Sequence, residues 1–158
     1  EFLEIRKPSG DFNRKALNLH PGVLITDEFM EAVREGSEFI LRSPKDGSER
    51  GKVDARSLFQ KLVETRLATG EPYIIFIDAV NRTMPKHHRD LGLKVTTSNL
   101  CSEITLPTGK DHLGADRTAV CCLSSMNLET WDEWNGDKHF VEDVMRFLDN
   151  VLSDYIAR

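Results

Sequence analysis

The most informative stretch of this sequence is Thr97-Ser98-Asn99-Leu100-Cys101-Ser102-Glu103-Ile104-Thr105-Leu106-Pro107. It places a carboxamide, a thiol and a carboxylate at alternate positions, Asn99, Cys101 and Glu103. The alternation predicts an extended strand, in which side chains two residues apart share a face at a spacing of about 6.5 Å. Such a strand would offer an amide, a sulfur and a base to one small polyol. The same pattern also fits an ordinary half-buried strand in which Cys101 is a small core residue.

Length and composition narrow the class of protein. The chain has 158 residues, 39% of them hydrophobic and 30% charged, which is typical of a globular domain with a sizeable core. A net charge of -5 argues against a nucleic-acid partner or an anionic membrane surface, and no apolar run is long enough for a membrane helix. Three cysteines are too few for a disulfide framework, and the first residues do not resemble a signal peptide. We therefore expect a reducing, cytoplasmic setting.

The first half of the chain alternates between strand and helix patterns. Thr26 and Asp54 are candidate N-caps, and Gly36 and Gly70 are candidate helix ends. The expected elements are a strand near 16–25, a helix 27–35, a strand 39–41, a polar loop 43–51, a helix 55–68 and a strand 73–77. The last strand is almost continuously apolar, as in a parallel sheet covered by helices. This order predicts an α/β fold.

The second half is less regular. Residues 81–97 read as a long polar connection, and the glycosylation pattern at Asn81 is treated as chance, because it matters only in secreted proteins. Residues 118–123 read as a strand in which Cys121 and Cys122 point to opposite faces. A final helix, capped by Asp137 and running to about Ala157, carries a broad apolar stripe that needs a partner.

Three segments together resemble one protein family. Asn-Leu-Cys-Ser-Glu-Ile at 99–104, followed by Leu-Pro, is similar to the active-site finger-loop motif of the ribonucleotide reductase large (alpha) subunit. Residues 69–81 resemble the strand that precedes this loop in the family, and residues 119–128 resemble the strand that follows it. The resemblance covers nearly the whole chain.

The resemblance implies a fold. The family has a ten-stranded α/β barrel made of two antiparallel halves, with the finger loop inside it. Large subunits of the family are several times longer than this chain. Residues 1–158 are therefore expected to be a single, incomplete segment of the catalytic barrel domain.

The resemblance also implies roles for particular residues. Cys101 matches the cysteine that becomes a thiyl radical and abstracts the ribose 3′ hydrogen. Glu103 would take the proton of the 3′ hydroxyl, and Asn99 and Ser98 would help to bind the sugar. Cys121 matches one of the two cysteines that donate reducing equivalents, whereas Cys122 reads as a small core residue. The second redox cysteine, the allosteric region and the phosphate-binding segment have no counterpart in this sequence.

Substrate, partners and cofactors follow from the same resemblance. The substrate would be a ribonucleoside diphosphate, reduced for DNA replication, and the reductant would be thioredoxin or glutaredoxin. The family forms an alpha homodimer, and the motif context is closer to class I enzymes, whose radical comes from a metal-containing beta subunit. No metal or other cofactor is expected in this chain.

Other interpretations stay open. A segment of a cobalamin-dependent reductase is one. A metal or redox module built from the three cysteines and a histidine is another, although their spacing matches no zinc pattern. A third is a non-catalytic fragment or paralogue, because the second redox cysteine is missing and the chain alone is not expected to complete a turnover.

Overall fold

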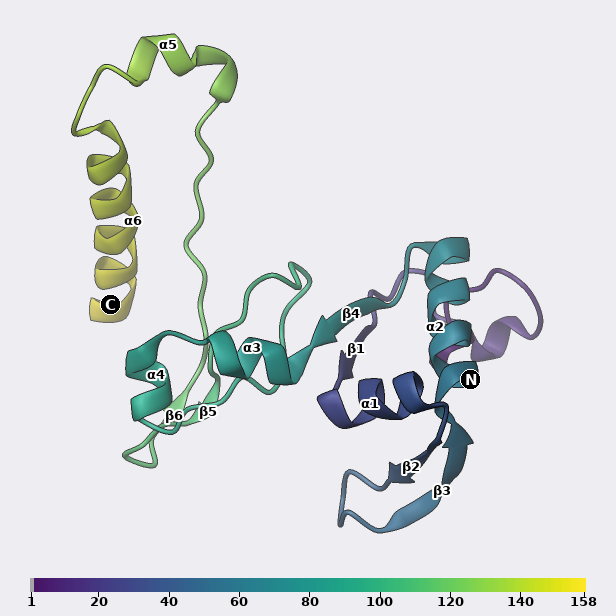
Figure 1. Ribbon diagram of the computed structural model, residues 1–158. Helices are drawn as coiled ribbons and strands as arrows, with labels where there is room; N and C mark the ends of the chain where they lie inside the picture. Colours follow the sequence, from purple (N-terminus) through teal and green to yellow (C-terminus); the bar gives the residue numbers. More distant parts are fainter. Residues whose placement is uncertain (1) are drawn as a thin grey trace. The chain divides into compact units, whose positions relative to one another are not determined.

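The computed structural model describes residues 2–158 (Figure 1). The chain divides into two compact units, one that extends to Thr118 and one from Ala119 to Arg158. The first unit holds most of the regular structure and all of the buried core. Two short 3₁₀ helices, η1 (Phe2–Glu4) and η2 (Phe12–Arg14), open it.

The first α-helix, α1 (Asp27–Glu35), has the boundaries that the sequence predicts. The hydroxyl of Thr26 accepts a hydrogen bond from the backbone N–H of Phe29 at 3.2 Å, which satisfies one of the free donors of the first turn. Gly36 ends the helix with φ 71°, and its N–H donates to the carbonyl of Ala32. A left-handed residue costs little at glycine, so the prediction of a stop there is confirmed.

The second long helix, α2 (Ala55–Thr69), is also confirmed. Its N-cap Asp54 accepts from the backbone N–H of Ser57 at 2.7 Å. The hydrogen bonds from the Ser57 hydroxyl and then from this N–H hold the pKa of Asp54 below its usual range. Gly70 closes the helix with φ 76°.

The two helices lie in the connection between a pair of parallel strands, β1 (Gly22–Ile25) and β4 (Tyr73–Phe76), which run side by side in Figure 1. Val23 is opposite Ile74 in the register. The parallel arrangement confirms the prediction for residues 73–77, whereas the strand expected near 16–25 is confined to its last four residues. Phe76 is 45% exposed, so β4 is not buried on both faces in this chain.

The buried core lies between α1, α2 and β1. Its buried side chains are Ile25, Phe29, Ala32, Ala55 and Leu62. The ring of Phe29 meets the ring of Phe39 edge to face, with the centroids 5.0 Å apart. The core therefore joins both helices to the next strand along the chain.

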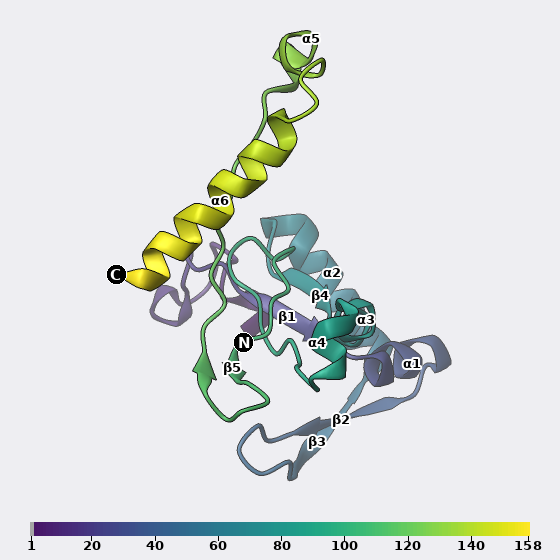
Figure 2. The same ribbon diagram turned by 90° about the vertical axis from the view of Figure 1, so that its left-hand side faces the viewer.

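Strands β2 (Glu38–Arg42) and β3 (Glu49–Asp54) form an antiparallel hairpin, whose two strands and connecting loop are visible in Figure 2. The strand expected at 39–41 is confirmed. The predicted polar loop at 43–51 is too long, because its last three residues already belong to β3. The backbone N–H of Ser43 donates to the carbonyl of Ser48 at 2.8 Å and closes the turn.

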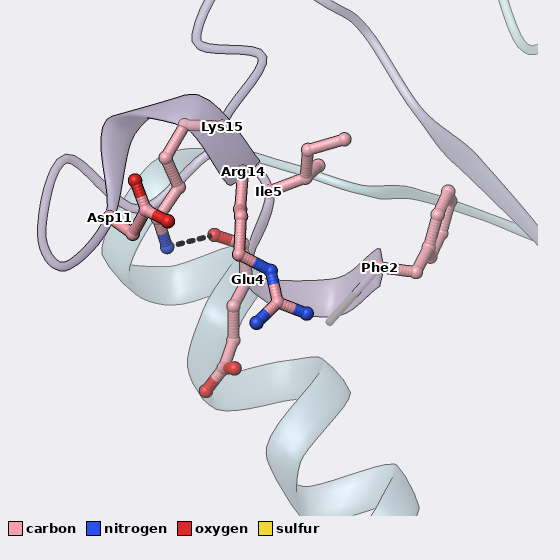
Figure 3. A pocket seen from close by; sticks show the side chains of 6 residues that line it. All are labelled: Phe2, Glu4, Ile5, Asp11, Arg14 and Lys15. Carbon is pink, nitrogen blue, oxygen red and sulfur yellow. Dashed lines mark hydrogen bonds between the residues drawn. The ribbon is translucent and has the colours of Figure 1, made fainter.

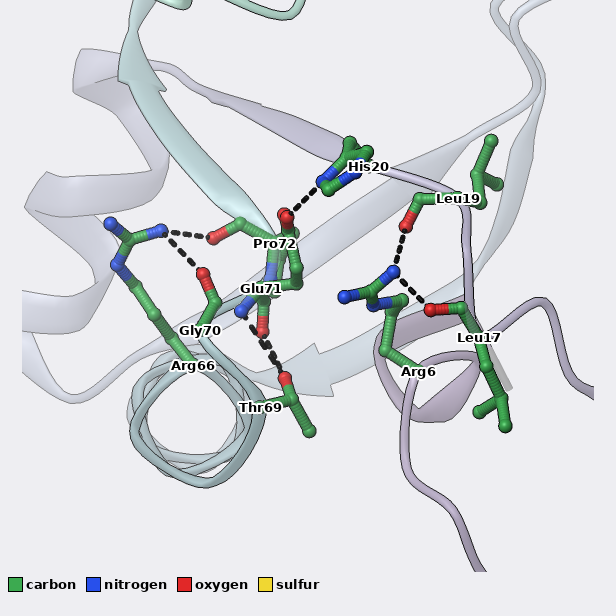
Figure 4. Close-up of polar contacts among 9 residues, drawn as sticks. All are labelled: Arg6, Leu17, Leu19, His20, Arg66, Thr69, Gly70, Glu71 and Pro72. Carbon is green, nitrogen blue, oxygen red and sulfur yellow. Dashed lines mark hydrogen bonds and ion pairs between the residues drawn. The ribbon is translucent and has the colours of Figure 1, made fainter.

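A polar network joins the chain segments that enter β1 and β4 (Figure 4). His20 Nδ1 lies 2.7 Å from Oε1 of Glu71, whose side chain is buried. Arg66 donates to the carbonyl of Pro72 at 2.7 Å. Arg6 donates to the carbonyls of Leu17 and Leu19. Cationic donors thus satisfy carbonyl groups where the chain lacks regular structure.

The long polar connection predicted for 81–97 is wrong in its first part. Helix α3 (Ile77–Thr83) begins directly after β4, and α4 (Lys86–Asp90) follows it. A small hairpin of β5 (Gly109–Lys110) and β6 (Asp116–Arg117) ends the first unit. In it, the side-chain hydrogen bond from Arg117 holds the pKa of Asp111 below its usual range.

The second unit is helical. It contains η3 (Leu128–Thr130), α5 (Trp131–Trp134) and α6 (Phe140–Ala157), and the strand predicted at 118–123 is absent. The final helix starts two residues later than predicted, because Asp137 accepts from the N–H of His139 in a turn before it. Large apolar side chains of α6 are exposed, among them Phe147 and Tyr155.

Within residues 2–158, the six short strands form three separate two-stranded sheets. The described chain therefore contains mixed helix and strand but no closed barrel. None of its described helices combines the length and the apolar character needed to span a membrane.

Candidate functional site

Residues 98–104, hereafter the cysteine turn, do not form the strand that the alternating pattern predicts. Residues 93–99 have no regular structure, and 100–103 form a turn. The side-chain carbonyl of Asn99 accepts a hydrogen bond from the N–H of Cys101 at 2.9 Å. The N–H of Ile104 then donates to the carbonyl of Cys101 at 3.1 Å. A side chain that bonds the backbone two residues later stabilises a turn instead of a strand.

Ser98 closes the turn. Its hydroxyl donates to the carbonyl of Ile104 at 2.7 Å, which ties the two ends of the cysteine turn together. The single hydroxyl hydrogen is therefore committed to the backbone, while the oxygen can still accept a hydrogen bond. Sugar binding by Ser98 stays a prediction.

The three side chains expected to carry the chemistry are exposed on this turn. Asn99, Cys101 and Glu103 are all exposed, and Cys101 is a free thiol. The Asn99 nitrogen carries two hydrogens that a ligand hydroxyl can accept. A carboxylate two residues from the thiol can take a proton from a hydroxyl within hydrogen-bond reach. One turn thus presents a thiol, a carboxylate and a carboxamide close together in the sequence.

The other two cysteines belong to the second unit. Cys121 and Cys122 are free and half-buried in an irregular segment that precedes η3. Because this segment is not a strand, the inference that the two thiols point to opposite faces loses its basis. The redox role of Cys121 stays a prediction.

Asn81 is a residue of the site region that the sequence interpretation missed. Its carboxamide, on α3, hydrogen-bonds both the N–H and the carbonyl of Val95, four residues before Asn99. The sequence analysis considered Asn81 only as part of a glycosylation pattern, which gives no information about this contact. The available signal was a polar carboxamide between the apolar strand 73–77 and the cysteine motif.

Two cavities lie elsewhere in the first unit. One of about 560 Å³ is lined by both charged and apolar side chains near the start of the chain (Figure 3), where Lys15 donates to the carbonyl of Glu4 at 2.9 Å. Another, of about 440 Å³, is mainly apolar and lies over β1, with Phe2, Leu24 and Leu58 among its lining residues. The cysteine turn lines neither cavity.

The described residues contain no group of three or more His, Cys, Asp or Glu side chains that could hold a metal ion. His87 and His88 are neighbours on α4, with their rings edge to face. The interpretation of the chain as a cysteine-based metal module therefore has no ligand cluster in residues 2–158 to support it.

Comparison with known families identifies the family of this chain. The family model of the ribonucleotide reductase barrel domain matches residues 1–156. The chain belongs to this ribonucleotide reductase family. The resemblance seen around Cys101 is thereby confirmed for almost the whole sequence.

The chain is also similar in sequence to individual ribonucleotide reductase proteins. A Frog virus 3 (isolate Goorha) protein named as a ribonucleoside-diphosphate reductase large subunit is 50% identical over 156 residues, which are 99% of this chain and 26% of that protein. The ribonucleoside-diphosphate reductase large subunit of Invertebrate iridescent virus 3 is 33% identical over 209 residues, covering 98% of this chain and 32% of that protein. The alpha subunit of Synechocystis is 29% identical, covering 96% of this chain and 23% of that protein. The reductase chain described here thus spans about a quarter to a third of these relatives.

Proposed function

We propose that this chain is the part of a ribonucleoside-diphosphate reductase large subunit that carries the thiyl radical. Such a subunit reduces ribonucleotides to deoxyribonucleotides for DNA synthesis. The observation that carries the proposal is the exposed Cys101, held between Asn99 and Glu103 on one short turn of a chain whose residues 1–156 match the reductase barrel. The names of the viral and cyanobacterial relatives support the same activity.

The proposed reaction begins and ends at Cys101. Its thiyl radical takes the hydrogen atom from C3′ of the ribose, which forms the S–H bond and leaves a radical at C3′. The 2′ hydroxyl leaves as water after gaining a proton. One thiol of a cysteine pair gives the proton that completes this water, and the two sulfurs become a disulfide. Of their two electrons, one goes with the second thiol proton to form the C2′–H bond, and the other reduces the 3′ carbonyl left by the loss of water to a ketyl radical. Cys101 then returns its hydrogen atom to C3′ and is a thiyl radical again, and Glu103 returns its proton to the 3′ oxygen.

Glu103 and Asn99 bind the sugar hydroxyls and promote these reaction steps. The Glu103 carboxylate takes the proton of the 3′ hydroxyl, which favours loss of the 2′ hydroxyl from the neighbouring carbon. The Asn99 amide donates to a sugar hydroxyl without adding charge. Ser98 contributes its free lone pairs to the same sugar. Their common origin on one turn supplies the orientation that the reaction needs.

Cys121 provides one of the two reducing thiols in this proposal. Its partner cysteine lies outside this sequence, and thioredoxin or glutaredoxin reduces the resulting disulfide by thiol exchange. Cys122 has no chemical role. The half-buried position of Cys121 is compatible with a thiol that must meet both substrate and reductant.

The finer fold proposed is the ten-stranded barrel, with the cysteine turn as its finger loop. A radical sulfur needs shielding from solvent, and Cys101 is exposed in this chain. The apolar cavity over β1 and the exposed Phe76 of β4 support further strands packing beside the parallel pair. Enclosure by the remainder of the barrel would bury the turn.

The proposed partners follow the class I pattern. A separate metal-containing beta subunit generates the radical, a ribonucleoside diphosphate is the substrate, and two alpha subunits associate. Effector nucleotides bind outside this segment. A cytoplasmic location is part of the same proposal, since the free thiols need a reducing compartment.

The test is Cys101→Ser in the native polypeptide that carries this sequence, assayed with its radical-generating partner and a dithiol reductant. We expect nucleotide reduction to fall to background while the dissociation constant of the nucleoside diphosphate stays within about twofold. Cys122→Ser is the matched control and should keep its activity. Substantial turnover by the Cys101→Ser protein would disprove the proposed role of the turn.

A further inference from the structure

Asn81 forms an unusual set of hydrogen bonds for one side chain. Its Oδ1 accepts from the N–H of Val95 at 2.9 Å, and its Nδ2 donates to the carbonyl of Val95 at 3.0 Å. A carboxamide has the donor and the acceptor of a peptide group. Asn81 therefore pairs with Val95 as a neighbouring strand would, although the segment 93–99 has no strand partner.

The Asn81 side chain is itself held in place. Its Nδ2 also donates to the carbonyl of Ile77 at 3.0 Å, one turn earlier on α3. Helix α3 begins where β4 ends, and β4 is paired in parallel with β1. The hydrogen bonds of Asn81 thus connect the segment before the cysteine turn to the only parallel sheet of residues 2–158.

Val95 is fixed from both directions. Its side chain is only 2% exposed, so burial restrains it, and its two backbone polar groups are bound by Asn81. Buried backbone groups that lose their partner are costly, and no shorter or purely accepting side chain can satisfy both. Asn99 and Cys101 lie only four and six residues after Val95 in the sequence, so the position of Val95 limits where they can lie.

We infer that Asn81 is a positioning residue that sets where the cysteine turn, and with it Cys101, lies relative to the parallel sheet. The inference rests on the proposed function, because it concerns the placement of the radical thiol. Asn81 touches no reacting atom and acts through Val95. Displacing a reacting group by about 1 Å can reduce a rate by about 100-fold. Loss of the Asn81–Val95 hydrogen bonds should therefore shift Cys101 and slow the reaction.

The first experiment measures the anchor without using activity. Asn81→Ala is made in the native polypeptide, and amide hydrogen exchange is followed by mass spectrometry. We expect exchange in peptides covering 95–104 to speed up at least tenfold, while peptides from α2 keep their protection. Asn135→Ala is the matched control, because Asn135 donates to the carbonyl of Trp131 one turn earlier and, among residues 2–158, its side chain binds no distant segment.

The second experiment separates positioning from binding. For Asn81→Ala, kcat for nucleoside diphosphate reduction should fall between tenfold and 100-fold, and the substrate dissociation constant should change less than twofold. Asn81→Asp keeps the shape of asparagine and the acceptor for the Val95 N–H, but it sets a carboxylate oxygen against the carbonyls of Ile77 and Val95, so its kcat should fall at least as far as that of Asn81→Ala. A side chain that only filled space would give no such order.

The outcomes are distinguishable. Unchanged exchange at 95–104 in Asn81→Ala overturns the inference whatever the activity. Faster exchange with unchanged kcat overturns it as well, provided that Cys101→Ser is inactive and the proposed function holds. If Cys101→Ser remains active, the proposed function fails, and the inference that Asn81 positions a radical thiol fails with it.

Discussion

The guanidinium of Arg56 packs directly against Gly36. It donates to the carbonyls of Val33 and Arg34 at 2.8 and 2.6 Å, the last turn of α1, and so binds the free acceptors of that helix end. A Cβ at Gly36 would lie 2.9 Å from the Arg56 Cζ. Arg56, the second residue of α2, thus caps the helix before it, and a side chain at position 36 would force the end of the Arg56 side chain to shift.

Gly36→Ala should therefore destabilise the end of α1 for two reasons. The left-handed φ of 71° costs about 1–2 kcal/mol for a residue with a Cβ, and Arg56 must also move. Gly92→Ala is the matched control, with φ 67° and no atom within 4 Å of the added Cβ. The free energy of unfolding, from denaturant titration, should fall more for Gly36→Ala than for Gly92→Ala. Equal losses in the two variants would show that the Arg56 contact does not matter.

The N-cap of α2 should make its stability depend on pH. The pKa of Asp54 is lowered in the folded chain, mainly by the Ser57 hydroxyl. A lowered pKa contributes stability above the ordinary aspartate value of about 3.9, and this contribution is lost as the pH falls through the lower folded value. We expect Asp54→Asn to remove this pH dependence of α2 protection below pH ~4. Ser57→Ala should weaken it, and an unchanged profile in both variants would contradict the assignment.

Two leucines of α2 offer a direct test of the core. Leu62 is 3% exposed and Leu67 is 83% exposed on the same helix. Leu62→Ala should cost about 2–5 kcal/mol of unfolding free energy, through lost burial and the cavity left behind. Leu67→Ala should change it by less than about 0.5 kcal/mol. Denaturant titration measures both, and similar values would mean that α2 packs on its other side.

The buried carboxylate of Glu71 predicts an asymmetry between two substitutions. Its Oε1 is bound by His20, and its Oε2 is buried without a hydrogen-bond partner among the described residues. His20→Ala leaves the buried carboxylate without this partner and should cost about 1–3 kcal/mol. Glu71→Gln removes the charge, keeps an acceptor for His20 and should cost less. Thermal unfolding of both variants gives the order, and a greater loss for Glu71→Gln would contradict it.

Local signals in the sequence were sufficient for the two main helices. Helix α1 begins after Thr26 and ends at Gly36, as predicted. Helix α2 begins after Asp54 and ends at Gly70, also as predicted. These residues act through their own turn, so no distant contact is needed to interpret them. Helix α3 lacks such signals, because its N-cap is Phe76 and no side chain caps it. The sequence pattern therefore places its first residue, Ile77, in the preceding strand and its last three residues in the polar connection.

The cysteine turn shows where periodicity fails. Alternation from Asn99 to Glu103 suits a strand, but Ser98 and Asn99 use their side chains to bond the backbone of the same segment. Both residue types compete in this way with sheet pairing, and that was the available warning. The family motif, by contrast, pointed to Cys101 because it depends on chemistry and not on local backbone shape.

The strand predicted at 118–123 and the barrel have a different explanation. A strand needs a neighbour to pair with, and residues 118–126 have no strand partner in the described chain. The apolar stripe of α6 likewise needs a partner, and its side chains are exposed in the described chain. Features that depend on contacts beyond these residues cannot be read from their own pattern.

The parallel pairing of β1 with β4 also bears on how the chain folds. It closes a loop across 51 positions, the separation of His20 and Glu71, whereas the β2–β3 hairpin and α2 form inside that loop from near neighbours. Closing a long loop is entropically costly until the contacts within it exist. We therefore expect the hairpin and α2 to be present in the folding transition state before the sheet. Substitution at Ile74 should then mainly accelerate unfolding, and a slowed refolding rate in stopped-flow measurements would reverse this order.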